Sequence, residues 1–390
     1  MAPILKDDLT PDIYIPTEIY IQKDIIPNIG YIIKKYGSKV ILITTANDFV
    51  ANSSIIETIY KNLKDLDIGC IVYDEISDIP DTEYVDSAVY FTKKTNCDTI
   101  IGLGGIESIN VAKAVAILTN NSLFCEDLFN YPDVQPPVML ITIPTHPIFG
   151  FEILPMFYLT EIHEMTKKVY RNSLLFPKAT IIDYNIANIP DEETIANNMI
   201  SALAMSTESV ISKKSNPFIN TYALKSIDLI FKNLPKAYID PKNPSPWNPL
   251  SIASIMSGFA FSASELSLSL AISLALSSRS DITVERGMGV ILPHVMEYNL
   301  TASSSKYVQM SKVMDESIKD ITVIEAAIKA IEGVRKLEID INITQRLSQF
   351  DIQKIELSRV AEIANSYHFI ENAPRPLSRD EIETILIAAY

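Results

Sequence analysis

Histidine is the side chain best suited to proton transfer or metal binding near neutral pH, and this chain has four: His146, His163, His294 and His368. Only His146 is a candidate catalytic residue, as a hydrogen-bond and proton donor. The carboxylates that could assist it are Glu107, Glu152, Glu265 and Glu285. Because one imidazole without a second in sequence reach is a weak signal, an ordinary loop histidine is the alternative interpretation. His294 is interpreted as structural.

Local motifs of known chemistry do not occur in the chain. It contains no HExxH, CxxC, GxSxG or GxxxxGKS/T string. Glycine is also scarce, with 11 residues, although phosphate-binding loops are built from glycine.

Charge and cysteine usage exclude some classes of partner. A formal net charge of −15 argues against DNA or RNA, because nucleic-acid binding depends on Lys and Arg neutralising phosphates. Cys70, Cys97 and Cys125 are odd in number and form no CxxC pair, which is typical of a reducing compartment. The N-terminal sequence MAPILKDDLTPDIYIP lacks the basic and apolar regions of a signal peptide. We therefore expect a cytoplasmic protein.

The first half of the chain alternates short apolar runs with amphipathic stretches. The runs predict buried parallel strands at 39–44, 68–73, 99–103, 138–143 and 180–183. Helical spacing covers 26–36, 55–66, 82–95 and 108–118. Strands that alternate with helices indicate a doubly wound α/β domain with a parallel sheet.

From about Asn185 the pattern changes to successive helices. They are predicted at 192–212, 220–231, 249–276, 291–300, 305–314, 321–337, 355–364 and 379–389. The alternation in Leu266–Leu270 (LSLSL) taken alone would indicate a strand, and residues 240–249 are predicted to form a proline-rich surface loop. Because 390 residues exceed the usual size of a single core, we expect two domains, an α/β domain over 1–184 and an all-α domain over 185–390.

Residues 252–276 resemble a membrane span in composition, because they contain no Lys or Arg. However, Glu265 lies at the middle, where a carboxylate in hydrocarbon costs roughly 2.5–3.5 kcal/mol, and seven serines interrupt the segment. We predict a buried core helix and no membrane association.

Several blocks of the sequence resemble the iron-containing alcohol dehydrogenase family, which has a dehydroquinate synthase-like fold. They follow in order over nearly the whole chain: PTEIYIQK (16–23), IIGLGGIESINVAKAVAILTNN (100–121), IPTHPIFGFEILPMFYLT (143–160), ISALAMSTESVISKKSNPFINTYAL (200–224), ASIMSGFAF (253–261), GVILPHVMEYN (289–299) and NAPRPLSRDEI (372–382). The resemblance implies a dinucleotide-binding N-terminal domain, a helical C-terminal domain, a metal at the cleft between them, and NAD(P)-dependent redox chemistry on alcohols or aldehydes.

The cofactor positions that the resemblance implies are partly retained, as Gly104, Gly105, Asn110, Lys113, Thr145 and Gly150. The family's GGGS turn becomes Gly104-Gly105-Ile106-Glu107, and Asn110 replaces an Asp. A side chain at Ile106 hinders close approach of the backbone to a pyrophosphate. The Glu107 carboxylate begins the next helix, in the region that a diphosphate would use, although a well-capped helix start also explains it.

The second nucleotide loop of the family is altered in the same direction. Ile148, Phe149 and Phe151 stand where the family has small or hydroxylic residues. Burial of such side chains gains roughly 1.5–3 kcal/mol each, so we expect them to fill the cleft.

The resemblance also assigns four metal-ligand positions, one Asp and three His, and here they are Ser201, Met205, Leu270 and Val284. A further His of the family, near substrate and cofactor, is Leu274. Hydroxyl and thioether groups are weak donors for iron or zinc, and Leu and Val are not donors at all. We expect a hydrophobic core at these positions and no catalytic metal.

Two functional hypotheses follow. In the first, the chain is a degenerate family member with no bound cofactor, a blocked nucleotide cleft and a structural or regulatory role, as a homo-oligomer or with an active paralogue. In the second, it is a metal-independent oxidoreductase that uses NAD or NADP on a small alcohol or aldehyde, with His146 in place of the Lewis acid. A module that binds some other ligand is compatible with the sequence, but no motif supports it.

Overall fold

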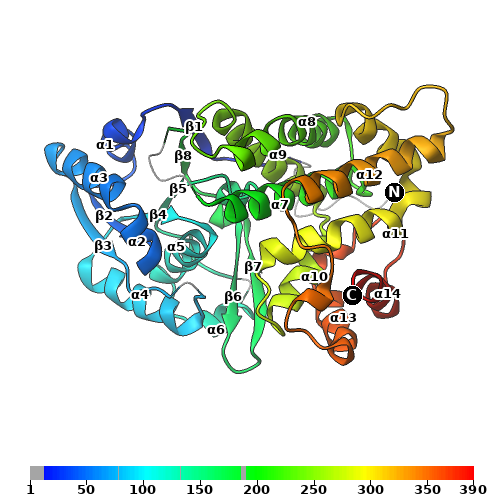
Figure 1. The fold of residues 1–390 in the computed structure, drawn as a ribbon. Coiled ribbons are helices and arrows are strands. Elements are labelled where there is room, and N and C mark those ends of the chain that lie inside the picture. Colours follow the sequence, from blue (N-terminus) through cyan, green and yellow to red (C-terminus); the bar gives the residue numbers. More distant parts are fainter. Residues whose placement is uncertain (1–12, 78, 132, 186–189) are drawn as a thin grey trace, which may run out of the picture.

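The structure is a computed structural model, and it describes residues 13–77, 79–131, 133–185 and 190–390 (Figure 1). Most of the N-terminal sequence used above to argue against a signal peptide, residues 1–12, lies outside the described residues.

A six-stranded parallel sheet forms the centre of the first half of the molecule. Its strands are β1 (Glu18–Gln22), β2 (Lys39–Ile43), β3 (Gly69–Tyr73), β4 (Thr99–Gly104), β5 (Met139–Pro144) and β8 (Ala179–Asp183). Their order in the sheet is β1-β8-β5-β4-β2-β3, and every neighbouring pair is parallel. The five predicted strands are confirmed, and β1 is an additional edge strand that the apolar pattern did not indicate.

Helices cover both faces of this sheet, as expected for a doubly wound domain. They are α1 (Ile29–Ile33), α2 (Ala46–Ala51), α3 (Ser53–Asp65), α4 (Thr82–Thr95), α5 (Ile106–Thr119) and α6 (Cys125–Leu128). Side chains of β2 alternate between the two faces, because Val40 and Leu42 pack with α1 and α3, whereas Ile41 and Ile43 pack with α4 and α5.

The second half consists of helices around one large hydrophobic core (Figure 1). They are α7 (Glu192–Ile211), α8 (Pro217–Ile239), α9 (Trp247–Ser264), α10 (Leu268–Ser277), α11 (Val284–Val313), α12 (Val323–Asp340), α13 (Leu357–Asn365) and α14 (Arg379–Ala389). Short 3-10 turns lie at 26–28, 151–153, 173–175, 347–349, 354–356 and 368–370. The predicted fold class, an α/β part with a parallel sheet followed by a helical part, is confirmed.

An antiparallel hairpin of β6 (Met156–Glu161) and β7 (Thr166–Arg171) interrupts the α/β pattern and was not predicted. Its β7 strand contacts the helical half at several points. The Lys167 backbone nitrogen donates to Ser278 Oγ at 2.9 Å, and its carbonyl accepts from the Tyr367 hydroxyl at 2.5 Å. Arg171 forms an ion pair of 2.5 Å with Glu265. The hairpin therefore joins the two halves of the molecule.

The prediction of one continuous helix over 249–276 is wrong. Glu265 adopts a left-handed conformation (φ 49°) that ends α9, and Ser267 caps α10 by accepting from the Leu270 nitrogen at 3.3 Å. The alternating LSLSL segment spans this break and the first turn of α10. The predicted separation of the helices at 291–300 and 305–314 is present as a kink at Ser303 (φ −132°), which divides α11 into two helical segments.

Within the described residues, no single helix is long and apolar enough to cross a membrane. The pair α9 and α10 reaches the required length and composition only together, and the two are bent by 100° at the break between them. The three cysteines are free thiols, and Cys97 and Cys125 are buried.

Candidate functional site

A cleft of about 340 Å³ lies where the carboxyl ends of the sheet strands meet the helical half. Open parallel sheets commonly bind ligands at this edge. The sheet side contributes Thr45 and Asp48, the turn from Gly105 to Glu107, and His146. The helical side contributes the first turns of α7 and α11, including Glu193, Asn197, Glu285 and Arg286.

The glycine turn after β4 already has an anion bound to it, the side chain of Asp48. Asp48 Oδ2 accepts hydrogen bonds from the Gly105 nitrogen at 2.9 Å and from Ser108 Oγ at 2.7 Å. A Cβ on Gly104 (φ 136°) would lie 2.0 Å from the same oxygen, so only glycine fits there. Asp48 therefore occupies the hydrogen-bond donors at the N-terminus of α5. In other proteins, phosphate groups often bind at such helix N-termini.

Sequence reasoning had assigned this anion role to Glu107, and the structure corrects it. Glu107 lies in the first turn of α5 and lines the cleft, but Asp48 accepts from the turn. Asp48 was missed because it follows a different strand and lies far from the turn in sequence. The one local signal was the position of Asp48 three residues after Thr45. The Thr45 side chain caps α2 by accepting a hydrogen bond from the Asp48 backbone nitrogen.

Glu107 and Glu285 form an acidic pair beside Tyr158 and Lys167. The Tyr158 hydroxyl donates to Glu285 Oε1 at 3.2 Å. Burial, and secondly the charge of Glu285, raise the pKa of Glu107 to about 8. Burial lowers the pKa of Lys167, and the two glutamates oppose that shift. A smaller hollow of about 130 Å³ lies among these side chains.

His146 follows β5 and lines both this cleft and a neighbouring hollow of about 330 Å³ near Trp247. Its Nδ1 lies 3.3 Å from Thr145 Oγ1. Burial lowers the pKa of His146, and Asp48 and Asp191 partly oppose the shift, so the imidazole is neutral near pH 7.

The structure brings only some of the suggested carboxylate partners near His146. Glu107 and Glu285 line the same cleft. Glu152 is buried elsewhere, where Ser254 donates to it at 3.1 Å and burial raises its pKa to about 7. Glu265 lies at the α9–α10 break with Arg171 and Lys214.

The predicted cofactor residues are likewise divided. Gly105 lines the cleft of about 340 Å³, and Thr145 lines the hollow of about 330 Å³ near Trp247. Asn110 lines the hollow of about 130 Å³, and its Oδ1 accepts from the Tyr158 nitrogen at 2.9 Å. Lys113 is fully buried, and its Nζ donates to the carbonyls of Phe151 at 2.6 Å and Met156 at 3.0 Å. Gly150 (φ 81°) packs against the Gly258 backbone.

The apolar loop residues are all buried in the helical core. Ile148, Phe149 and Phe151 have no exposed surface, and Ile106 is 4% exposed. The Phe149 and Phe151 rings lie 5.8 Å apart, and Phe151 meets Tyr158 edge-on at 5.5 Å. These side chains are buried as expected, but the expectation that they fill the cleft is wrong, because a space of about 340 Å³ remains, lined by Ile106 and by none of the other three.

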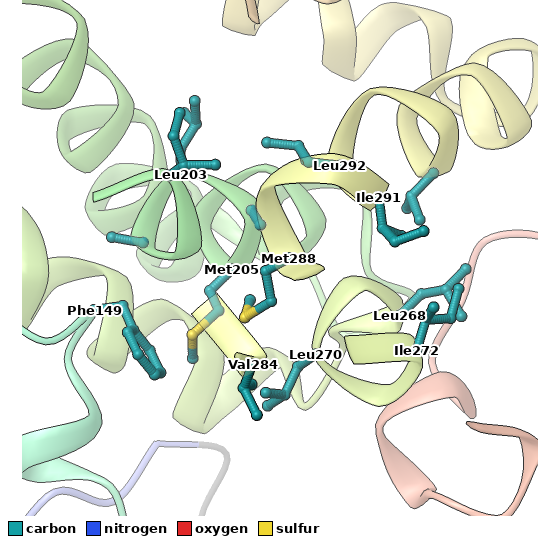
Figure 2. Close-up of a cluster of buried hydrophobic side chains, with 14 of the residues drawn as sticks. Phe149, Leu203, Met205, Leu268, Leu270, Ile272, Val284, Met288, Ile291 and Leu292 are labelled. Atoms are coloured by element: carbon teal, nitrogen blue, oxygen red, sulfur yellow. The ribbon is translucent and has the colours of Figure 1, made fainter. Parts of the chain in front are cut away.

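Met205, Leu270 and Val284 lie in the same core, near Phe149 and Met288, where α7, α10 and α11 meet (Figure 2). Met205 and Leu270 have no exposed surface, and neither has Leu274. Ser201 Oγ donates to the carbonyls of Asn197 at 2.9 Å and Glu285 at 3.4 Å, so this hydroxyl is already used within the protein.

A different group of side chains has the donors that a metal ion needs. Oxygen or nitrogen atoms of Glu126, Glu161 and His163 all lie within 4.8 Å of one another, at α6 and the β6–β7 turn. His163 Nε2 is 3.4 Å from Glu126 Oε2. These residues could hold a metal, and sequence reasoning missed them because only the close spacing of Glu161 and His163 is visible locally. None of them lines the cleft.

Comparison with protein families accounts for nearly the whole chain. A family model described as "Iron-containing alcohol dehydrogenase" matches residues 16–184, and one described as "Fe-containing alcohol dehydrogenase family, C-terminal" matches residues 195–390. The chain belongs to the iron-containing alcohol dehydrogenase family. The resemblance inferred from the sequence blocks is thereby confirmed.

Individual members of the iron-containing alcohol dehydrogenase family are similar along their full length. The NAD-dependent methanol dehydrogenase of Bacillus methanolicus is 23% identical, over 96% of this chain and 98% of that protein. The 1,3-propanediol dehydrogenase of Klebsiella pneumoniae is 26% identical, over 91% and 92%. The solved structure of an alcohol dehydrogenase from Oenococcus oeni superposes with a TM-score of 0.93 at 21% identity, over 98% and 100%.

The side chains at the four positions that the sequence resemblance assigns to metal ligands are poor donors for iron. They offer one hydroxyl, one thioether and two hydrocarbon groups, and the hydroxyl already donates within the protein. A pyrophosphate fits the glycine turn poorly as well, because the Asp48 carboxylate holds the Gly105 nitrogen.

Proposed function

We propose that this chain is a family member without the family's catalysis: its cleft does not bind a dinucleotide, and its four family ligand positions hold no metal. Its role is then structural or regulatory in the cytoplasm, in an assembly with itself or with an active relative. It binds neither nucleic acid nor membranes. The two proposed domains, 1–184 and 185–390, keep the overall fold of solved family members, and this supports the proposal.

The observation that carries the proposal is the hydrogen bonding of Asp48 to the glycine turn. A diphosphate at the same donors would have to displace a carboxylate that lies 2.9 Å from the Gly105 nitrogen. The displaced Asp48 carboxylate would remain beside the ligand, and like charges at short distance repel each other.

A second, independent observation supports the loss of the metal. Met205, Leu270 and Val284 pack against other apolar side chains in the helical core. A divalent ion there would have no charged ligand to offset its loss of hydration, and such desolvation costs far more than weak donors return.

Nucleotide binding is tested by thermal unfolding with millimolar NAD+, NADH, NADP+ and NADPH. Because a ligand at a hundred times its Kd stabilises a protein by about 2.7 kcal/mol, true binding would raise the Tm clearly. We expect no rise for the wild-type chain. Asp48→Ala is the matched variant, because it frees the donors of the turn. A rise for the wild-type chain would contradict the proposal.

Metal content needs a control for the group at Glu126, Glu161 and His163. Iron and zinc are measured by mass spectrometry in the wild-type chain and in His163→Ala. We expect any bound metal to be lost in His163→Ala. Stoichiometric iron that survives this substitution would contradict the proposal.

The position of His146 favours a second candidate function, a metal-independent NAD(P)-dependent oxidoreductase. A neutral imidazole that lines the cleft beside Glu107 could donate a hydrogen bond to a carbonyl oxygen. The change in NADH and NADPH absorbance with a panel of small aldehydes distinguishes the two candidates. Turnover that is lost in His146→Ala would establish the second.

A further inference from the structure

Acidic side chains dominate the walls of the cleft. The space of about 340 Å³ meets the hollow of about 130 Å³ at shared lining residues, Glu107, Thr283 and Glu285. Among the described residues that line the two spaces, the acidic ones are Asp48, Glu107, Asp191, Glu193, Asp281 and Glu285. The basic ones are Lys167 and Arg286. The combined site therefore has an excess of negative charge.

Some of these charges are already engaged. Arg286 forms an ion pair of 3.2 Å with Glu193 and lies over the Phe350 ring at 5.1 Å. Asp48 accepts from the glycine turn. The carboxyl groups at the centre are thus those of Glu107 and Glu285, and the nearby basic group is Lys167, whose charged form burial disfavours.

Glu285 is incompletely satisfied for a buried carboxylate. It is 9% exposed, and its Oε1 accepts from Tyr158. Among the described residues, no hydrogen bond or ion pair reaches its Oε2, whereas the Glu107 carboxyl group accepts from its own backbone nitrogen. Glu285 lines the open space, and an oxygen there without a protein donor can accept from a donor supplied by a ligand.

A metal ion is not the cation that this arrangement suits. Within the described residues, no third ligating side chain joins Glu107 and Glu285 within the 4.8 Å spacing found at Glu126, Glu161 and His163. The available volume is that of a small organic molecule. Apolar side chains also line the site, including Ile106, Ile282 and Val284, and these suit a hydrocarbon chain.

We propose that the cleft binds a small alkylammonium ion between Glu107 and Glu285. The ammonium group donates to Glu285 Oε2 and to the Glu107 carboxylate, and the alkyl chain contacts the apolar wall. This inference goes beyond the proposed function, because it assigns a positively charged ligand to the cleft.

Binding should also move a proton. Glu107 has a raised pKa of about 8, so most of it is protonated at pH 7. A cation beside the carboxyl group favours its ionised form, and therefore binding at pH 7 releases a proton from Glu107.

The test is isothermal titration of the full chain with n-butylammonium chloride and, separately, with 1-butanol, in two buffers of different ionisation enthalpy. We expect saturable binding of the amine, at least tenfold tighter than that of the alcohol. The heat should depend on the buffer for the wild-type chain and not for Glu107→Gln. Glu285→Gln should weaken amine binding at least tenfold, whereas Glu332→Gln, an exposed site, should not.

Unfolding curves of each variant establish that it is folded before titration. Equal affinity for amine and alcohol, unchanged amine affinity in Glu285→Gln, or no amine binding would each overturn the inference. NADH is titrated into the same samples, so that the outcome for the proposed function is obtained separately. A chain that binds neither ligand would refute the alkylammonium site and leave the proposed function standing.

Discussion

Gly150 and Gly258 pack backbone against backbone, which joins the loop after β5 to helix α9. A Cβ on Gly258 would lie 2.6 Å from the Gly150 carbonyl oxygen, closer than real Cβ contacts. Gly258→Ala should therefore force the loop and helix apart and lower the free energy of unfolding by roughly 1–3 kcal/mol, as overpacking does. Urea unfolding measures the change.

The matched control for this substitution is Gly69→Ala. The three atoms nearest to a Cβ at Gly69 all belong to Lys39, and the closest is the side-chain Cγ at 3.2 Å. Its effect on stability should be small, and equal losses in the two variants would show that the close approach is unimportant.

The hydrogen bonds of Asp48 should contribute measurably to stability. Asp48→Ala leaves the Gly105 nitrogen and Ser108 Oγ without their acceptor, and loss of a comparable helix cap costs about 0.5–2 kcal/mol. Asp48→Asn retains one acceptor oxygen and should lose less. Chemical denaturation of both variants is the measurement, and a larger loss for Asn than for Ala would contradict this interpretation.

The position of Leu270 should behave as hydrophobic core. Leu270→Met conserves volume and should cost less than about 1.5 kcal/mol. Leu270→His places an imidazole among apolar side chains and should cost several kcal/mol more, because a buried polar group without a partner is unfavourable. Thermal unfolding with and without added zinc provides the check. Stabilisation of Leu270→His by zinc would indicate that a metal site survives at this position.

Glu107 should make stability depend on pH. Its pKa rises from an ordinary 4.5 to about 8 on folding, so the folded chain binds more protons between these values. The stability that Glu107 provides is therefore complete below about pH 4.5 and is lost as the pH rises towards 8. The free energy of unfolding of the wild-type chain minus that of Glu107→Gln should fall as the pH rises over this range, at most by about 1.4 kcal/mol per pH unit.

Unfolding of the two proteins at several pH values measures this difference. The loss should level off above about pH 8, where the folded and unfolded forms both carry the charge. A difference that rises with pH would mean that the carboxylate has a favourable partner in the folded protein.

Much of the fold could be predicted from the sequence because the buried strands are continuous apolar runs. Residues 39–43 and 99–104 form strands within a residue of the predicted bounds. The β6–β7 hairpin was missed because Met156–Glu161 lies in a long apolar block with no turn signal of its own. The α9–α10 break was missed because Glu265 takes a left-handed conformation that is unusual outside glycine and asparagine.

The burial of Met205, Leu270 and Val284 in a hydrophobic core could be predicted from residue types alone. Leu and Val have no metal-donor atoms, and the Met thioether is a weak donor. The role of Asp48 and the group of Glu126, Glu161 and His163 depend on contacts between distant segments. Such pairs have no periodic pattern in one sequence. They could only be recognised once the sheet order placed the segments together.

The contacts of strand β7 have a mechanical consequence. Its residues Lys167 and Arg171 are bonded to Ser278, Tyr367 and Glu265, which all belong to the helical half. Any motion of the hairpin away from the helical half would have to break these bonds at both ends of β7. The hairpin and the helical half are therefore expected to move as one unit.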